Sequence, residues 1–139
     1  MKKSVVLLLI FAGFFSFDLV AQEEVISVSQ DEEKEIIEVY YFHYTRRCAT
    51  CQAVEDESEA ALGKLYPEEV DSGKITFTSV NLEEESNETL AEKLQVAGQS
   101  LLVVRGDKQF NLTNDAFKYA RSNPEKLQSS IKEVIDPIL

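Results

Sequence analysis

The chain has 139 residues and a formal net charge of -11, with two cysteines, one histidine and no tryptophan. Once an N-terminal export signal is set aside, this length suffices for one domain with one hydrophobic core and is too short for two. So acidic a chain argues against binding to nucleic acid or to an anionic membrane surface. We therefore look for a single domain whose site does not depend on a basic surface.

The first residues predict a secretory signal peptide over residues 1–21. Lys2 and Lys3 precede an apolar run from Val5 to Phe17, and a small residue stands at the expected cleavage point. The run is shorter than the ~20 apolar residues that a spanning helix needs, so we expect no membrane insertion of the mature chain. The predicted location is periplasmic or secreted. An uncleaved N-terminal anchor is the alternative.

Residues 22–34 are acidic with few apolar residues, and we interpret them as a leader, with a short edge strand as the alternative. The domain itself is predicted over residues 35–139. Residues 36–42 are mostly β-branched and aromatic, which favours a strand buried on both faces. From Cys51 to Leu65, apolar residues recur at helical spacing and acidic residues fill the other face. Cys48 is therefore expected at the N-terminus of a helix, with Cys51 one turn further in.

A thiol at a helix N-terminus has a lowered pKa, because free N–H groups and the helix dipole stabilise the thiolate. Arg46 and Arg47 precede Cys48 and are predicted to add to this effect, or else to pair with surface carboxylates. The spacing predicts Cys48 as nucleophile and Cys51 as the thiol that resolves a mixed disulfide. The alternatives are a permanent structural disulfide and half of a zinc site.

His43 is the only histidine in the sequence, and it lies five residues before Cys48. It could exchange protons with Cys51, since its unperturbed pKa is near neutral. The alternative is a loop histidine that hydrogen-bonds the backbone. A zinc site would need ligands beyond the cysteines, and His43 is the one further candidate, so we predict no metal site.

The remaining elements alternate in a simple order. Gly106 and Asp107 predict a hairpin turn, and Asn123 with Pro124 predicts a capped helix. The predicted elements are strands over residues 74–82, 101–104 and 108–113, a helix over 83–95, a loop over 96–100, and helices from Asn114 and from Pro124. A strand–helix–strand crossover gives a parallel pair, and the hairpin adds antiparallel strands. We predict an α/β fold with a central mixed sheet of about four strands flanked by helices (βαβαββα).

This order, with Cys-x-x-Cys at the first strand-to-helix junction, resembles the thioredoxin fold over residues 35–139. Val80-Asn81-Leu82 and the stretch from Ser100 to Asp107 resemble the second and third core strands of that family. The resemblance implies a thiol–disulfide oxidoreductase that acts on protein thiols or disulfides without a cofactor. The pattern from Tyr41 to Cys51 more narrowly resembles exported bacterial thioredoxin-like proteins labelled nitrophenyl compound nitroreductase subunit, ArsF family. We take that label as a name only, since the sequence shows no flavin or nicotinamide site.

Two features depart from the thioredoxin pattern. The family places a cis-proline before its third core strand, where it aligns the substrate and discourages metal binding. Here Gln99, or else Ser100, holds that position, so no cis bond is expected. Gly98, Gln99 and Ser100 are the predicted substrate-facing loop. The second departure is the buried acid that the family carries under its cysteines, because this chain has Tyr41 or Phe42 there.

The sequence thus predicts an exported thiol–disulfide oxidoreductase that uses Cys48 and Cys51 on protein substrates. The alternative is a binding module of the same fold, in which the cysteines are structural or hold a soft metal or metalloid such as Cu(I) or As(III). Two thiolates would leave such an ion incompletely coordinated. That alternative therefore needs a third ligand, from His43, a second chain or an exogenous thiol.

Overall fold

The computed structural model describes residues 36–139. The predicted signal peptide over residues 1–21 and the acidic leader over 22–34 lie outside the described residues. The described part begins one residue before the first strand. The two cysteines follow the end of that strand.

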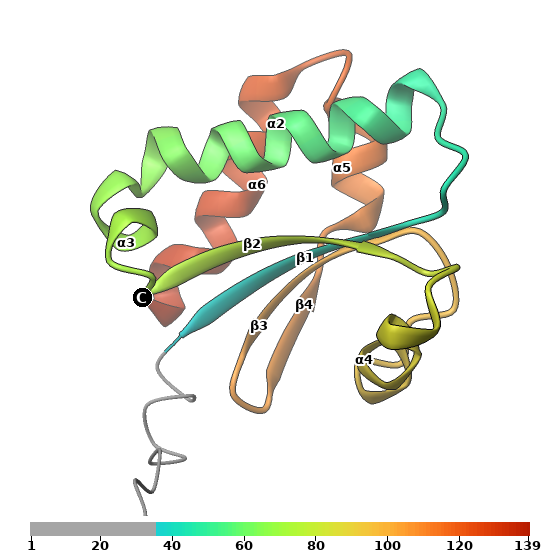
Figure 1. The fold of residues 1–139 in the computed structure, drawn as a ribbon. Helices are drawn as coiled ribbons and strands as arrows, with labels where there is room; N and C mark the ends of the chain where they lie inside the picture. Colours follow the sequence, from blue (N-terminus) through green and yellow to red (C-terminus); the bar gives the residue numbers. More distant parts are fainter. Residues whose placement is uncertain (1–35) are drawn as a thin grey trace, which may run out of the picture.

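Residues 36–139 contain a four-stranded mixed sheet with the order β2-β1-β3-β4 (Figure 1). The strands are β1 (Ile37–His43), β2 (Ile75–Asn81), β3 (Ser100–Arg105) and β4 (Lys108–Asn111). β1 runs parallel to β2, with Val39 opposite Phe77, and antiparallel to β3, with Tyr41 opposite Leu101. β3 and β4 form the predicted hairpin, in which Gly106 supplies the positive φ of the turn. The predicted mixed sheet is confirmed.

Helices cover both faces of the sheet, but unequally. Figure 1 shows α2, α5 and α6 together on one side and α4 on the other. Their bounds, with the short α3 and two 3-10 turns, are α2 (Ala49–Leu65), α3 (Pro67–Asp71), η1 (Glu85–Asn87), α4 (Glu88–Lys93), α5 (Thr113–Tyr119), α6 (Pro124–Ile135) and η2 (Asp136–Ile138). α6 begins as predicted, with Pro124 in its first turn and the Asn123 side chain accepting a hydrogen bond from the Lys126 N–H.

The alternation of side chains along β1 divides the core into two parts. Ile37, Val39 and Tyr41 face α2, α5 and α6 and belong to a large core, which we call the deep core. Phe42 points to the other face and packs in a smaller cluster under α4, which we call the shallow core. Both faces of β1 are therefore buried, as its sequence predicts.

The helix predicted over residues 83–95 is much shorter than expected. The chain forms the turn η1 and then only the six residues of α4. The Asn87 side chain donates a hydrogen bond to the Asn81 carbonyl, and this bond ties the segment to the end of β2 instead of letting it start as a helix. At the other end, Gln95 takes a positive φ of 54° and stops the helix.

Several other boundaries differ from prediction by a few residues, and for two of them the structure shows a cause. Pro67 ends α2 as expected but also opens α3, because proline suits the first turn of a helix. β4 ends at Asn111 rather than Thr113. The Asn111 side chain accepts a hydrogen bond from the Thr113 N–H, and α5 starts at that residue.

Candidate active site

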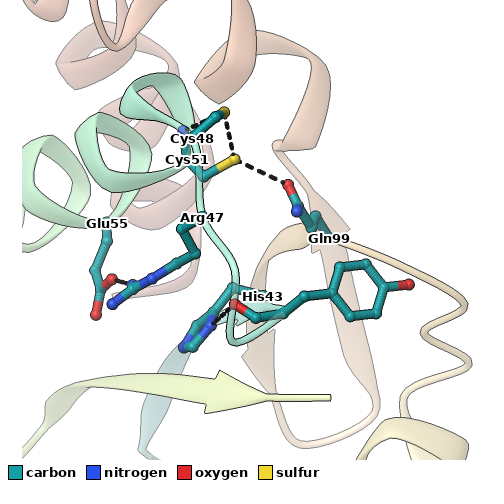
Figure 2. Close-up of polar contacts among 7 residues, drawn as sticks. His43, Arg47, Cys48, Cys51, Glu55 and Gln99 are labelled. Atoms are coloured by element: carbon teal, nitrogen blue, oxygen red, sulfur yellow. Dashed lines mark hydrogen bonds and ion pairs between the residues drawn. The ribbon is translucent and has the colours of Figure 1, made fainter. Parts of the chain in front are cut away.

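The two cysteines lie where β1 gives way to α2. Cys48 is the N-cap of α2, and its sulfur accepts a hydrogen bond from the Cys51 N–H at 3.4 Å. Cys48 is exposed and Cys51 is only 4% exposed, and both are free thiols. Their sulfurs are 2.7 Å apart (Figure 2). Cys51 is oriented inwards because it begins the buried face of α2, which continues through Val54 and Leu62.

The surroundings separate the acidities of the two thiols. Hydrogen bonds that the Cys51 thiol and the Cys51 N–H donate to the ionised Cys48 sulfur lower the pKa of Cys48. Burial, followed by the hydrogen bond to Cys48, raises the pKa of Cys51. An exposed sulfur that readily ionises therefore lies beside a buried sulfur that resists ionisation. This asymmetry is what a nucleophile and a resolving thiol need.

Gln99 lies across from the cysteines. Its side-chain Oε1 accepts a hydrogen bond from the Cys51 thiol at 3.4 Å, as Figure 2 shows. Ser100 is instead the first residue of β3, and its hydroxyl donates to the Gly98 carbonyl at 2.9 Å. Residues 36–139 contain no cis peptide bond, as expected for a chain without proline at this position. Of the three predicted loop residues, Gln99 is the one that the structure brings into contact with a cysteine.

The arginines are placed differently from expectation. Arg47 forms an ion pair with Glu55, two turns into α2, and Figure 2 shows its side chain directed along the helix and away from the sulfurs. Hydrogen bonds from Cys51 are the main cause of the lowered pKa of Cys48. Arg46 is exposed. The pairing of Arg47 with a surface carboxylate is the alternative that the sequence left open.

His43 is not in the expected loop. It is the last residue of β1 and is buried, with its ring 5.8 Å from that of Tyr41. Its Nδ1 lies 2.9 Å from the Tyr44 carbonyl oxygen, and Figure 2 shows the ring well apart from the sulfur pair. The backbone contact corresponds to the second interpretation of this residue. Direct proton exchange with Cys51 is not supported by this placement.

The loop before Cys48 is held by two residues that sequence reasoning missed. The Thr45 N–H donates to the Glu83 carboxylate at 2.6 Å, and the Asn81 side chain donates to the Thr45 hydroxyl at 2.9 Å. The bond from Thr45 lowers the pKa of Glu83. One signal could have revealed these contacts. Parallel strands end at the same edge of a sheet, so polar residues just after β2 should lie near the loop that follows β1.

The described residues offer no obvious metal centre. Within residues 36–139 no group of three or more His, Cys, Asp or Glu side chains is arranged to hold a metal ion. Since His43 lies apart from the sulfurs, the third ligand that the binding-module alternative requires is not supplied by that residue. No helix in the described part of the chain is both long and apolar enough to span a bilayer.

Cavities lie beside the cysteines but not around them. A cavity of about 390 Å³ lies beyond Tyr44 and is lined by Leu82, Val96 and several glutamates. A second, of about 270 Å³, is lined by residues 94–100 and by parts of β3 and β4. Neither of these two is lined by Cys48 or Cys51. The Cys48 sulfur is exposed at the surface and not enclosed by either of these cavities.

The sheet order, the pairing of its strands and the cysteine pair after the central strand define a thioredoxin-like fold, as the sequence predicts. No protein-family model matches the chain, and no curated protein matches it. Three similar solved structures are thioredoxins. Fasciola hepatica thioredoxin is 23% identical with a TM-score of 0.47, covering 74% of this chain and 85% of that one.

The germline-specific thioredoxin Deadhead from Drosophila melanogaster is 17% identical with a TM-score of 0.47, covering 75% of this chain and 86% of its own. The thioredoxin of Trypanosoma brucei brucei is 17% identical with a TM-score of 0.46, covering 78% and 87%. The fold follows from the sheet topology, and the chemistry open to the site follows from the geometry of its cysteines.

Proposed function

We propose that the protein is a thiol–disulfide oxidoreductase in which Cys48 is the nucleophile and Cys51 the resolving thiol. One observation carries this proposal. An exposed sulfur caps the N-terminus of α2 at 2.7 Å from a buried sulfur, and the two thiols have pKa values shifted in opposite directions. A structural disulfide would need no such asymmetry.

Written as reduction of a substrate, the exchange has two steps. The Cys48 thiolate attacks one sulfur of a substrate disulfide, and the other substrate sulfur leaves as a thiolate with the electrons of the broken bond. Cys51 then loses its proton and attacks the Cys48 sulfur, which releases the second substrate thiolate. The protein ends as the Cys48–Cys51 disulfide, having given two electrons to the substrate. The same steps in reverse oxidise a substrate dithiol.

A protein substrate fits this site better than a small molecule. The Cys48 sulfur lies at the surface, and the two cavities near it are lined by other residues. Tyr44, four residues before Cys48, is 39% exposed and offers apolar surface in the loop that leads to the reactive sulfur. An extended segment carrying a disulfide or a dithiol could therefore lie across Cys48, Gln99 and Tyr44.

Export belongs to the same proposal. Lys2, Lys3 and the apolar run that follows support a cleaved signal and a periplasmic or secreted protein. The pattern from Tyr41 to Cys51 supports membership of the exported bacterial group that the sequence resembles. N-terminal sequencing of the protein from a producing cell tests this point. A mature chain that starts near residue 22 agrees with export, and an intact Met1 in the cytoplasm contradicts it.

Redox titration tests the activity. The protein is equilibrated with glutathione buffers of graded potential and quenched with an alkylating agent. Mass spectrometry then counts the free thiols. We expect a two-electron transition between the dithiol and the Cys48–Cys51 disulfide within the accessible range. A Cys48–Cys51 disulfide that is not reduced even at strongly reducing potentials would contradict the proposal and indicate a structural disulfide. Stoichiometric metal that stays tightly bound to the freshly reduced protein would instead favour the binding module.

A further inference from the structure

Gln99 ends beside the buried sulfur of the redox pair. Its Oε1 lies 3.4 Å from the Cys51 sulfur, and Figure 2 shows the end of its side chain directed at that sulfur. Within residues 36–139 the Cys51 sulfur has two polar side-chain partners, Cys48 and Gln99. Cys48 forms and breaks bonds during exchange, whereas Gln99 does not react. Gln99 is therefore the partner that can act on Cys51 at every stage.

The backbone around Gln99 is held in place by the sheet. Ser100, the next residue, begins β3 and pairs with Phe42 near the end of β1. The Ser100 hydroxyl donates to the Gly98 carbonyl at 2.9 Å, which ties together the residues on both sides of Gln99. The end of β1 also leads into the loop that carries the cysteines. The pairing of these two strands therefore keeps Gln99 close to Cys51.

The end of the Gln99 side chain has room to turn. Gln99 is half-buried and lines the cavity of about 270 Å³ that residues 94–100 share with β3 and β4. Rotation about the last bond of a glutamine side chain is broad, and a half turn exchanges its oxygen with its nitrogen. Within the described part of the chain, the bond to Cys51 is the one hydrogen bond of this amide. The amide can therefore present an acceptor or a donor to the same sulfur.

The resolving step reverses what the Cys51 sulfur needs from its partner. The thiol donates to the Gln99 oxygen, but Cys51 must ionise before it can attack the mixed disulfide. Burial and the bond to Cys48 raise the pKa of Cys51, and backbone hydrogen bonds in the first turn of α2 offset only part of this. A buried thiolate needs a further donor, because water is excluded from it. The N–H groups of the same amide can supply one.

The titratable groups near Cys51 do not supply a positive charge. In the intermediate, Cys48 is bonded to the substrate and carries no charge. Tyr41 keeps its proton at neutral pH, because burial and then the neighbouring Cys51 raise its pKa to about 12. Arg47 pairs with Glu55 and is directed away from the sulfurs. The thiolate is therefore left to hydrogen-bond donors.

We propose that Gln99 is a catalytic residue of the resolving step. Its side-chain oxygen accepts a hydrogen bond from the Cys51 thiol, and after a half turn of the amide its N–H donates to the Cys51 thiolate that attacks Cys48. This inference rests on the proposed function. One uncharged side chain thereby serves both protonation forms of the buried sulfur, and the donor is already within reach when the proton leaves.

The step balances without a further reactant. Cys51 releases its proton to solvent and supplies the electron pair of the new bond to the Cys48 sulfur. The bond between Cys48 and the substrate sulfur breaks, and the departing sulfur keeps that electron pair and takes a proton from solvent. Gln99 retains both of its amide protons throughout.

The first test compares Gln99→Leu with the wild-type protein in reaction with oxidised glutathione. Acid quenching and mass spectrometry follow the Cys48–glutathione mixed disulfide over time, so that the rate of resolution is separated from the rate of formation. We expect Gln99→Leu to resolve this species about fivefold more slowly at neutral pH. That factor is the excess of a hydrogen bond to an ionised group over one to a neutral group.

Gln52→Leu is the matched control. Gln52 directly follows Cys51 on α2 and is exposed, so the same substitution there adds apolar surface near the cysteines without touching the buried sulfur's amide partner. We expect it to leave the lifetime of the mixed disulfide unchanged. Equal slowing in Gln52→Leu and Gln99→Leu would show that added apolar surface is the cause, and would contradict the role of the Gln99 amide.

A second measurement needs no turnover. In a Cys48→Ala protein, Gln99 is the remaining polar side-chain partner of Cys51 within residues 36–139, as it is in the mixed disulfide. Adding Gln99→Leu should raise the pH midpoint of Cys51 ionisation, read from thiolate absorbance, by about 0.7 units, which is the same factor of five. A residue that only held the loop in shape would not move this midpoint.

A third measurement leaves Gln99 unchanged. In the Cys48→Ala protein labelled with nitrogen-15, one side-chain N–H proton of Gln99 should move downfield in the NMR spectrum as Cys51 ionises, with the midpoint seen by absorbance. The side-chain N–H signals of Gln52 should stay in place. The same spectrum shows whether the protein is folded. Gln99 signals that do not change across the Cys51 midpoint would refute donation to the thiolate.

The outcomes separate the two proposals. Wild-type protein that forms no mixed disulfide and no Cys48–Cys51 bond with glutathione would overturn the proposed function, and the role of Gln99 with it. If the wild type completes both steps and Gln99→Leu resolves at the same rate, the role of Gln99 is refuted and the function stands. Faster resolution with a lowered Cys51 midpoint would also refute it, because the amide would then act only as an acceptor that holds Cys51 protonated.

Discussion

The two faces of the sheet differ in how they are built and in what they hold. On one face, three helices cover the deep core, in which side chains of β1 meet fully buried residues such as Val54 and Leu127. On the other, the six residues of α4 cover the shallow core around Phe42. Cys51 belongs to the buried side of α2 on the deep face, whereas Gln99 comes from the segment that leads out of α4.

The thicker packing of the deep face favours a fixed geometry for the redox pair, and the thinner layer of the other face favours a more adaptable loop. A redox pair must keep its geometry, and a helix packed on a large core supplies it. A loop that meets varied substrates can rest on a thinner layer. Two hydrogen bonds join the redox pair and its preceding loop to the segments after β2 and α4. One runs from the Cys51 thiol to Gln99, and the other from the Thr45 N–H to Glu83.

The largest expected effect is on stability, and it contrasts the two cores. Leu127→Ala removes a fully buried side chain from the deep core and should lower the free energy of unfolding by about 4 kcal/mol. Leu94→Ala in the shallow core should cost about 2 kcal/mol, because the thin layer can collapse around the smaller residue. Urea unfolding of both variants measures the difference. Equal costs would show that the two faces are packed alike.

The next effect concerns the two sulfurs. At neutral pH an alkylating agent should modify Cys48 at least about tenfold faster than Cys51 in the folded, reduced protein, since Cys51 is buried and has the higher pKa. Mass spectrometry of peptides from a timed reaction gives both rates. Unfolding in denaturant should make them nearly equal. Equal rates in the folded protein would remove the assignment of nucleophile and resolving thiol.

A smaller effect on stability is expected for the hydrogen bond that joins the C-terminal ends of α2 and α6 on the deep face. The buried Tyr66, just after α2, donates a hydrogen bond of 2.6 Å to Asp136 after α6. Tyr66→Phe should lower the free energy of unfolding by about 1 kcal/mol. Thermal or urea unfolding measures it, and Tyr44→Phe at an exposed phenol is the matched control, with an expected change below about 0.5 kcal/mol.

The same contact predicts a pH dependence. Hydrogen bonds from Lys132 and then Tyr66 lower the pKa of Asp136 in the folded protein. Its contribution to stability is therefore fully present above the pKa that it has in the unfolded chain, and is lost as the pH falls through the folded-state value. The difference between wild type and Tyr66→Phe should shrink in acid. A difference that grows as the pH falls would contradict the direction of this shift.

The sequence predicts the fold well where one residue type decides the backbone. The β-branched and aromatic residues from Ile36 to Phe42 favour a buried strand, and Pro124 after Asn123 favours the start of a helix. The Cys-x-x-Cys spacing places one sulfur at a helix N-terminus by helix geometry alone. These features depend on neighbours along the chain and not on the tertiary structure.

The contacts that the sequence did not reveal depend on where side chains point from a loop. Thr45, Arg46 and Arg47 follow one another, yet Thr45 binds the end of β2, Arg46 is exposed, and Arg47 pairs with α2. Sequence adjacency places an arginine near Cys48 but does not fix the direction of its guanidinium. The shortened α4 has a related cause, because the direction of the Asn87 side chain, which bonds to the backbone of Asn81 six residues earlier, is not fixed by its place in the sequence.

The smallest expected effect is that of Arg47 on the pKa of Cys48. Since Arg47 faces Glu55 and hydrogen bonds lower the pKa of Cys48, Arg47→Gln should raise the pH midpoint of Cys48 alkylation by less than about 0.3 units, further reduced by salt. Arg47→Gln combined with Glu55→Gln controls for the carboxylate left unpaired, and should also leave the midpoint nearly unchanged. Cys51→Ala removes the thiol donor and should raise the midpoint clearly more. If Arg47→Gln raises it as much as Cys51→Ala does, the guanidinium and not the buried thiol is the main stabiliser of the Cys48 thiolate. The loop, and not the deep face, would then set the reactivity of the site.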